Sequence, residues 1–151
     1  MIEGKGRSGR RLCWKGEMQD QIRVLLADPY SFVRQRLRSI LDSDPLFVVV
    51  GEAASGKVAL RIVTEEHPDV ALIDHQLPDM SGLDLCRRMV QLCPRTAVLI
   101  MTIFKDRELA DACLRAGARD CVLKDVETLH LKERLLAVMQ GRPEPGAPFS
   151  A

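Results

Sequence analysis

Four polar side chains stand where apolar segments of the chain end. Asp28 follows the apolar run 22–27, Asp74 follows 70–73, Thr102 follows 96–101 and Lys124 follows 119–123. Two carboxylates, a hydroxyl and an ammonium are suited to phosphoryl transfer onto a carboxylate. One carboxylate attacks and forms an acyl phosphate. A divalent cation shared by both carboxylates bridges to the phosphoryl oxygens, and the ammonium stabilises the phosphoryl charge.

Each of these residues also has a simpler structural interpretation. Asp28 and Pro29 form a typical helix start, with the aspartate as N-cap and the proline in the first turn. Asp74 precedes a turn-rich loop, Thr102 can merely end a strand, and Lys124 can be a solvated surface lysine. The four come from different apolar segments, so helix amphipathicity does not explain the set. Their coincidence favours one shared site.

The apolar segments alternate with segments of helical periodicity. The sequence predicts strands at 22–27, 46–50, 70–73, 96–101 and 119–123, and helices at 30–42, 56–66, 83–92, 106–116 and 126–140. Continuous apolar strands are typical of a parallel sheet covered on both faces. Right-handed crossovers then give a doubly wound α/β fold. Ligands of such sheets bind at the carboxyl ends of the strands, where the four polar residues stand.

The two ends of the chain differ from this pattern. Residues 1–20 hold four glycines among basic residues and no apolar signal-peptide core, so we expect a flexible N-terminal extension. Residues 141–151 contain three prolines and are predicted to be a linker or tail. The folded domain is therefore expected over 21–140.

Composition excludes several classes of protein. The chain has 22 Lys and Arg against 21 Asp and Glu, and this near-neutral balance gives no support to bulk binding of nucleic acid. No apolar run approaches the roughly 20 residues of a membrane span. The five cysteines form no CxxC pair, which favours reduced thiols and a cytoplasmic protein.

Five segments carry a family resemblance: IRVLLAD, VVVGEAASGKVAL, PDVALIDHQLPDMSGLDLCRRM, TAVLIMT and AGARDCVLKD. Together they resemble the CheY-like receiver domain of response regulators, in particular its NarL/FixJ (LuxR-type) branch, over about residues 21–140. The resemblance implies a flavodoxin-like (βα)5 fold, whose five-stranded parallel sheet has the order 2-1-3-4-5. It also implies a two-component signalling function rather than an enzyme in the usual sense.

The resemblance also implies roles for particular residues. Asp74 matches the phosphoacceptor, Thr102 the switch hydroxyl and Lys124 the lysine that stabilises the phosphoryl charge. The implied cofactor is Mg²⁺, held by Asp28, Asp74 and the backbone carbonyl of Gln76. The implied partners are a sensor histidine kinase and a second copy bound through the last two helices and the fifth strand. Control of transcription would pass through a DNA-binding domain absent from this chain, whose own residues are not expected to contact nucleic acid.

Three residues depart from the family pattern. Pro29 replaces the second acidic residue, which predicts weak Mg²⁺ binding. Ile103 is bulky where the family has a small residue, and is expected to cover part of the path to Asp74. Cys121 replaces the aromatic switch residue. These departures support the alternative of a degenerate pseudo-receiver that binds proteins independently of phosphorylation.

Two further interpretations concern the surroundings of the site. A flavodoxin-type cofactor binder is disfavoured, because a bound phosphate needs a Gly-rich or Ser-rich loop and the first strand ends in Asp28-Pro29. His75 adjoins Asp74, but strand alternation predicts that the two side chains point apart.

Overall fold

The computed structural model describes residues 11–14, 16–124 and 128–140. Its main sheet has five parallel strands: β3 (Ile22–Ala27), β4 (Phe47–Ala53), β5 (Val70–Asp74), β6 (Ala97–Thr102) and β7 (Asp120–Leu123). They lie in the order β4-β3-β5-β6-β7. For these five strands that is the predicted order 2-1-3-4-5, so the structure confirms the predicted fold class.

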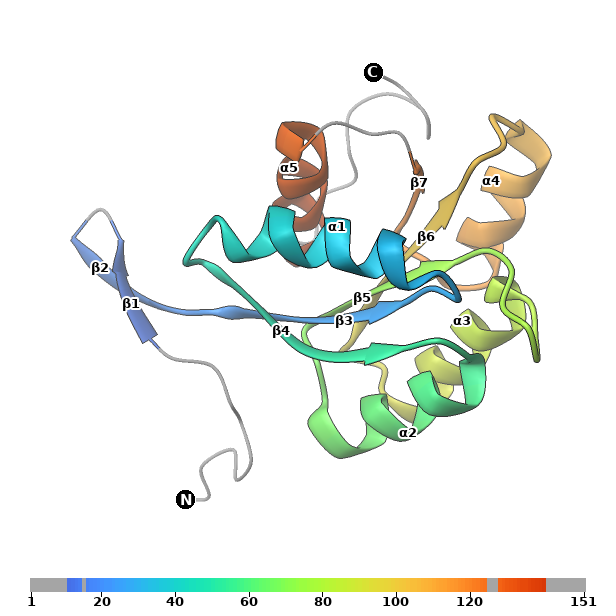
Figure 1. Ribbon diagram of the computed structural model, residues 1–151, viewed down its shortest axis with the longest axis horizontal. Helices are drawn as coiled ribbons and strands as arrows, with labels where there is room; N and C mark the ends of the chain where they lie inside the picture. Colours follow the sequence, from blue (N-terminus) through green and yellow to red (C-terminus); the bar gives the residue numbers. More distant parts are fainter. Residues whose placement is uncertain (1–10, 15, 125–127, 141–151) are drawn as a thin grey trace.

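Helices cover both faces of the sheet (Figure 1). They are α1 (Ser31–Asp42), α2 (Gly56–Glu66), α3 (Gly82–Leu92), α4 (Arg107–Arg115) and α5 (Thr128–Met139). The central strands are buried on both sides, which is why their sequences are continuous apolar runs. Leu25 faces the core under α2, α3 and α4, whereas the next residue, Leu26, faces the core under α1 and α5.

A buried ion pair fixes α5 to β7. Arg134 Nε lies 2.7 Å from Asp120 Oδ2, and Arg134 Nη2 lies 2.7 Å from Asp120 Oδ1. Both side chains are almost completely buried. Such a two-point contact holds the guanidinium and carboxylate planes in register, so it sets the position of the last helix against the last strand.

The edge strand β4 extends to Ala53, three residues beyond the predicted end at Val50. Its pairing with β3 continues past an irregularity, from Leu25 opposite Gly51 to Ala27 opposite Ala53. A Cβ at Gly51 would lie only 2.7 Å from Ile62 Cγ2 of α2. Glycine therefore belongs to this strand because the helix packs closely on it.

The start of α1 corrects one structural interpretation of Asp28. The helix begins at Ser31, and Tyr30 is its N-cap, without a side-chain cap hydrogen bond. Asp28 is therefore not the N-cap. Its Oδ1 instead accepts a hydrogen bond of 2.9 Å from the Tyr30 N–H, which orders the turn between β3 and α1. Asp125 directly precedes the predicted helix 126–140, a position where an aspartate is suited to be the N-cap, and it lies outside the described residues.

An antiparallel hairpin precedes the main sheet, where the sequence predicted no regular structure. It consists of β1 (Arg11–Trp14) and β2 (Glu17–Asp20). Gly16 has φ +80, a left-handed conformation suited to the tight connection between these strands. The sequence therefore did not reveal these two strands, and the expected flexibility of residues 1–20 stays a prediction. The boundaries of 1–20, 21–140 and 141–151 stay predictions.

Candidate functional site

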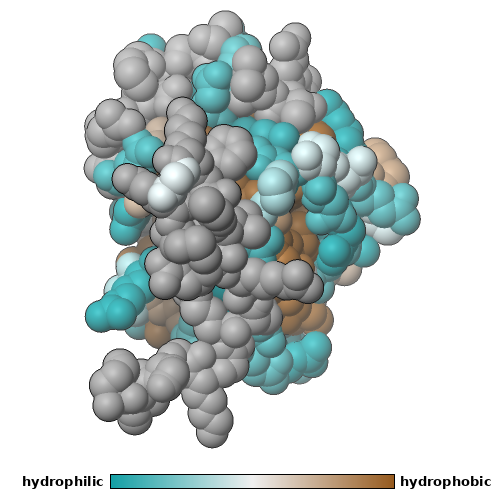
Figure 2. Space-filling model, turned by 90° about the vertical axis from the view of Figure 1, so that its left-hand side faces the viewer, coloured by the Kyte–Doolittle hydropathy of each residue, from teal (hydrophilic) through white to brown (hydrophobic). Residues whose placement is uncertain are grey.

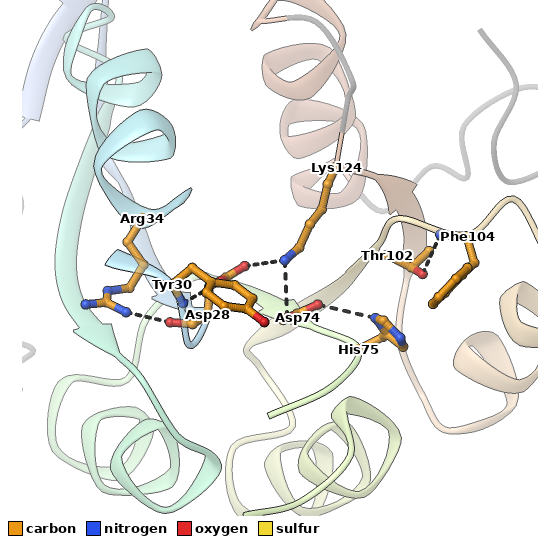
Figure 3. Close-up of polar contacts among 8 residues, drawn as sticks. All are labelled: Asp28, Tyr30, Arg34, Asp74, His75, Thr102, Phe104 and Lys124. Atoms are coloured by element: carbon orange, nitrogen blue, oxygen red, sulfur yellow. Dashed lines mark hydrogen bonds and ion pairs between the residues drawn. The ribbon is translucent and has the colours of Figure 1, made fainter. Parts of the chain in front are cut away.

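Three of the predicted site residues meet at the carboxyl edge of the sheet (Figure 3). Lys124 Nζ lies 2.7 Å from Asp28 Oδ2 and 3.2 Å from Asp74 Oδ2. Asp28 is fully buried and Asp74 is 4% exposed. The ammonium therefore lies between two buried carboxylates that come from β3 and β5.

The strand ladder continues into this site. The Asp28 N–H donates to the Ala53 carbonyl, and the Lys124 N–H donates to the Thr102 carbonyl. Each site residue is thus the first one past its strand or the last one in it, and its backbone stays hydrogen-bonded to the neighbouring strand. This geometry explains why residues so distant along the chain converge here.

Charge in the site favours the protonated form of Lys124. Burial lowers the pKa of Lys124, but hydrogen bonds and charge interactions with Asp28 and Asp74 outweigh this effect and leave the pKa raised. The ring of Tyr30 adds a weaker contact, with its centroid 5.8 Å from Nζ. The ammonium therefore stays charged at neutral pH and is suited to stabilise further negative charge.

Thr102 is buried on the adjacent strand β6. Its Oγ1 accepts a hydrogen bond of 3.0 Å from the Phe104 backbone N–H. The hydroxyl is thus tied to the loop after β6, and its proton is left for another acceptor. Thr102 therefore lies at the end of the strand next to β5, and its hydroxyl contacts the loop that precedes α4.

The loop after β5 makes a tight turn back toward Asp74. Gln76 forms an isolated antiparallel bridge with Ser81, and the Gly82 N–H donates 2.7 Å to the His75 carbonyl. A Cβ on Gly82 would collide with the Asp74 carbonyl oxygen and lie 2.7 Å from His75 Cα. Glycine is required here because the start of α3 packs directly on the backbone of the site.

The position of His75 differs from the prediction. His75 Nδ1 lies 3.3 Å from Asp74 Oδ1, so the two side chains do not point apart. Strand alternation does not apply, because β5 ends at Asp74 and the chain turns immediately afterwards. The His75 ring also meets the Phe104 ring edge-on, with 5.5 Å between centroids and 88° between planes. The sequence did not predict this contact, although the end of the apolar run at residue 73 indicated that the strand, and with it the alternation, stops near Asp74.

The family departures have structural counterparts. Cys121 is fully buried among the apolar residues under α3 and α4. A hydrogen bond with the Cys113 thiol and burial raise the pKa of Cys121, so this residue is a neutral core thiol. Ile103 is 68% exposed, and its effect on access to Asp74 stays a prediction.

The carboxylates fit a weakly held Mg²⁺. In the part of the chain that the structure describes, no group of three or more His, Cys, Asp or Glu residues could hold a metal ion. Mg²⁺ is commonly bound by one or two carboxylates together with water and phosphate oxygens, and Asp28 and Asp74 supply two. Asp28 Oδ2 is buried. Its close neighbour is Lys124 Nζ, which would compete with the cation.

Comparison with known proteins identifies the class. Residues 24–136 match the response regulator receiver domain, and the chain belongs to this family of two-component signalling proteins. Receiver domains are signalling modules rather than classical enzymes. The family typically binds Mg²⁺.

Relatives in the NarL/LuxR-type branch support the assignment. The chain is 38% identical over 122 residues to the DNA-binding transcriptional activator DevR/DosR of Mycobacterium tuberculosis, covering 80% of this chain and 56% of that protein. A LuxR-family response regulator from Aurantimonas sp. SI85-9A1 superposes with a TM-score of 0.78 at 29% identity, covering 82% of this chain and 88% of the other. The receiver domain of a putative response regulator NarL from Mycobacterium tuberculosis gives 0.75 at 29% identity, with coverages of 81% and 98%.

The chain spans little more than half the length of the curated relatives that it matches, between 50% and 56% of each of three of them. These relatives include transcriptional regulators, so transcription regulation is the context of the family. Of the helices that the structure describes, none has both the length and the apolar character needed to cross a membrane.

Proposed function

We propose that this chain accepts a phosphoryl group on Asp74 from a phosphohistidine of a sensor histidine kinase in the cytoplasm. The observation that carries the proposal is the position of Lys124, whose ammonium lies within ion-pair distance of both Asp28 and Asp74. This arrangement holds a nucleophilic carboxylate next to a fixed cation, as phosphoryl transfer requires.

The proposed reaction uses the residues in distinct roles. A carboxylate oxygen of Asp74 forms a bond to phosphorus, the P–N bond of the phosphohistidine breaks, and the departing imidazole takes up a proton from water. Lys124 stabilises the charge of the phosphoryl oxygens, and the Thr102 hydroxyl donates to one of them. Asp28, Asp74 and the Gln76 carbonyl would hold Mg²⁺, which when bound would neutralise phosphoryl charge.

The proposed output is a change in protein contacts. The Thr102 hydroxyl oxygen accepts a hydrogen bond from the Phe104 N–H. When the hydroxyl turns to a phosphoryl oxygen, it therefore acts on the loop before α4. The surface formed by α4, β7 and α5 is then the proposed contact for a second copy. Because a relative is a DNA-binding transcriptional activator, we infer that control of transcription passes through a DNA-binding domain outside this chain, not through direct nucleic-acid contact by these residues.

Intact-mass measurement tests this function. The purified chain is incubated with Mg²⁺ and acetyl phosphate, and we expect a gain of about 80 Da, one phosphoryl group. Asp74→Asn should abolish the gain, because the amide is not a nucleophile of this kind. A wild-type chain that stays unmodified, or a gain that persists in Asp74→Asn, contradicts the proposal.

A pseudo-receiver is the second candidate, and one observation favours it. Pro29 supplies no carboxylate, and Lys124 already forms ion pairs with the two that remain. In this case the chain binds its partner independently of phosphorylation. Calorimetric titration would then show negligible Mg²⁺ binding, and a partner would bind wild type and Asp74→Asn equally well.

A further inference from the structure

His75 contacts the site without a role in the proposed reaction. Its Nδ1 lies 3.3 Å from Asp74 Oδ1, while Lys124 Nζ lies 3.2 Å from Asp74 Oδ2. The two oxygens of the carboxylate therefore have different neighbours. An ionised carboxylate only accepts hydrogen bonds, so a hydrogen bond between these two atoms requires Nδ1 to be the donor. This bond directs Oδ2, the other oxygen, toward the ammonium.

Phe104 connects His75 with Thr102 (Figure 3). The ring of Phe104 meets the His75 ring edge-on, a favourable geometry for two aromatic rings. The backbone N–H of the same residue donates to Thr102 Oγ1. One residue of the loop after β6 thus contacts the neighbours of Asp74 through both its side chain and its backbone.

In the family pattern, the last strand of the sheet carries the aromatic switch residue. Here its position holds the buried thiol of Cys121. We propose that His75 is a positioning residue, which holds the Asp74 carboxylate with Oδ2 toward Lys124 and transmits the state of this carboxylate to the loop 103–106 through Phe104. The proposed transmission to the loop 103–106 rests on the proposed phosphorylation of Asp74.

Charge changes on Asp74 explain how the contact responds. When Oδ2 bonds to phosphorus and the leaving group departs, the carboxylate becomes an acyl phosphate and Oδ1 becomes its carbonyl oxygen. A neutral carbonyl accepts a weaker hydrogen bond than a carboxylate. The bond from His75 weakens, while the Thr102 hydroxyl gains a phosphoryl oxygen as acceptor. Both changes act on Phe104, three residues before α4 begins at Arg107.

The first test needs no phosphorylation. Nitrogen-15 NMR of the histidine rings identifies which ring nitrogen carries the proton. We expect the Nδ1–H tautomer for His75 in the wild type and the Nε2–H tautomer in Asp74→Ala, where the acceptor is lost. His67, whose ring contacts Cys93 away from the site, is the internal control and should not change. An Nε2–H tautomer of neutral His75 in the wild type overturns the proposal.

The second test compares two substitutions of His75. His75→Asn keeps an N–H donor near the place of Nδ1, whereas His75→Leu removes the donor. With acetyl phosphate, Asp74 attacks phosphorus and acetate leaves. We expect this rate to fall in His75→Leu, where the ring no longer orients the carboxylate with Oδ2 toward Lys124, and to recover in His75→Asn. The backbone amide signal of Phe104 should shift on phosphorylation in wild type and much less in His75→Leu.

The outcomes separate this inference from the proposed function. A His75→Leu chain with the wild-type rate and the wild-type response of Phe104 overturns the role of His75, while phosphorylation itself stands. A wild-type chain that gains no phosphoryl group overturns both the proposed function and transmission through Phe104. In that case the Nδ1–H tautomer would still support the positioning of Asp74.

Discussion

Replacing Pro29 with aspartate is expected to strengthen Mg²⁺ binding. The present site has a net charge of −1, from Asp28, Asp74 and the ammonium of Lys124. A third carboxylate about 5 Å from each of these groups is repelled by about 3 kcal/mol per carboxylate and attracted equally by the ammonium, at an effective dielectric constant of about 20. About 3 kcal/mol of net repulsion then remains for a dication to relieve.

The new carboxylate also attracts the dication directly, so both effects raise the affinity. Loss of an outer-sphere partner commonly costs about 10- to 100-fold in metal affinity, and a direct ligand should contribute at least as much as the lower figure. We therefore expect Pro29→Asp to raise the Mg²⁺ affinity by about 10- to 100-fold.

Calorimetric titration with MgCl₂ measures this effect. Pro29→Ala removes the ring without adding charge, and Pro29→Asn adds an uncharged oxygen of similar size. Thermal unfolding of each variant shows that the chain is folded. The electrostatic reasoning is refuted if Pro29→Ala gains as much affinity as Pro29→Asp, or if a folded Pro29→Asp binds Mg²⁺ no better than wild type.

Three further predictions concern stability, measured as the free energy of unfolding in urea titrations. The pKa of Lys124 is raised in the folded chain, so its charge stabilises the fold fully below about pH 10.4, the unfolded value, and this contribution is lost as pH rises through the folded pKa. The difference in the free energy of unfolding between wild type and Lys124→Met should therefore shrink in that range. Arg134→Met should cost about 3–5 kcal/mol, because Asp120 stays buried without this partner, and adding Asp120→Leu should recover most of the loss; a double variant no better than the single one would contradict this. Gly82→Ala should cost about 1–3 kcal/mol, because its Cβ meets the backbone of the loop after β5, and an unchanged stability would show that this loop yields freely.

The sheet and three site residues were predictable because they depend on simple rules. Buried parallel strands are mostly apolar, and the polar residue at the end of each one marks the sheet edge. Asp28, Asp74 and Lys124 follow this rule, and the structure brings them together.

The contact of His75 with Asp74 was not predictable in the same way. Alternation assumes that a strand continues. The sequence predicted the end of the apolar run and a turn-rich loop, but not the turn geometry that brings the His75 ring to Asp74. The hairpin β1–β2 was missed for a related reason. Its strands have four residues each, too few to establish a period. In both cases a turn decided the outcome, and turn geometry depends on contacts beyond the local sequence.

The order of the strands also affects the synthesis of the protein. Asp28 follows the first strand of the main sheet, but its cation, Lys124, follows the last one. A nascent chain on the ribosome therefore carries both acidic groups long before their counter-ion is made. Burying a carboxylate without a partner is costly, so burial of Asp28 and Asp74 is favoured once Lys124 has been synthesised. The two ion pairs at this edge are thereby tied to completion of the whole sheet.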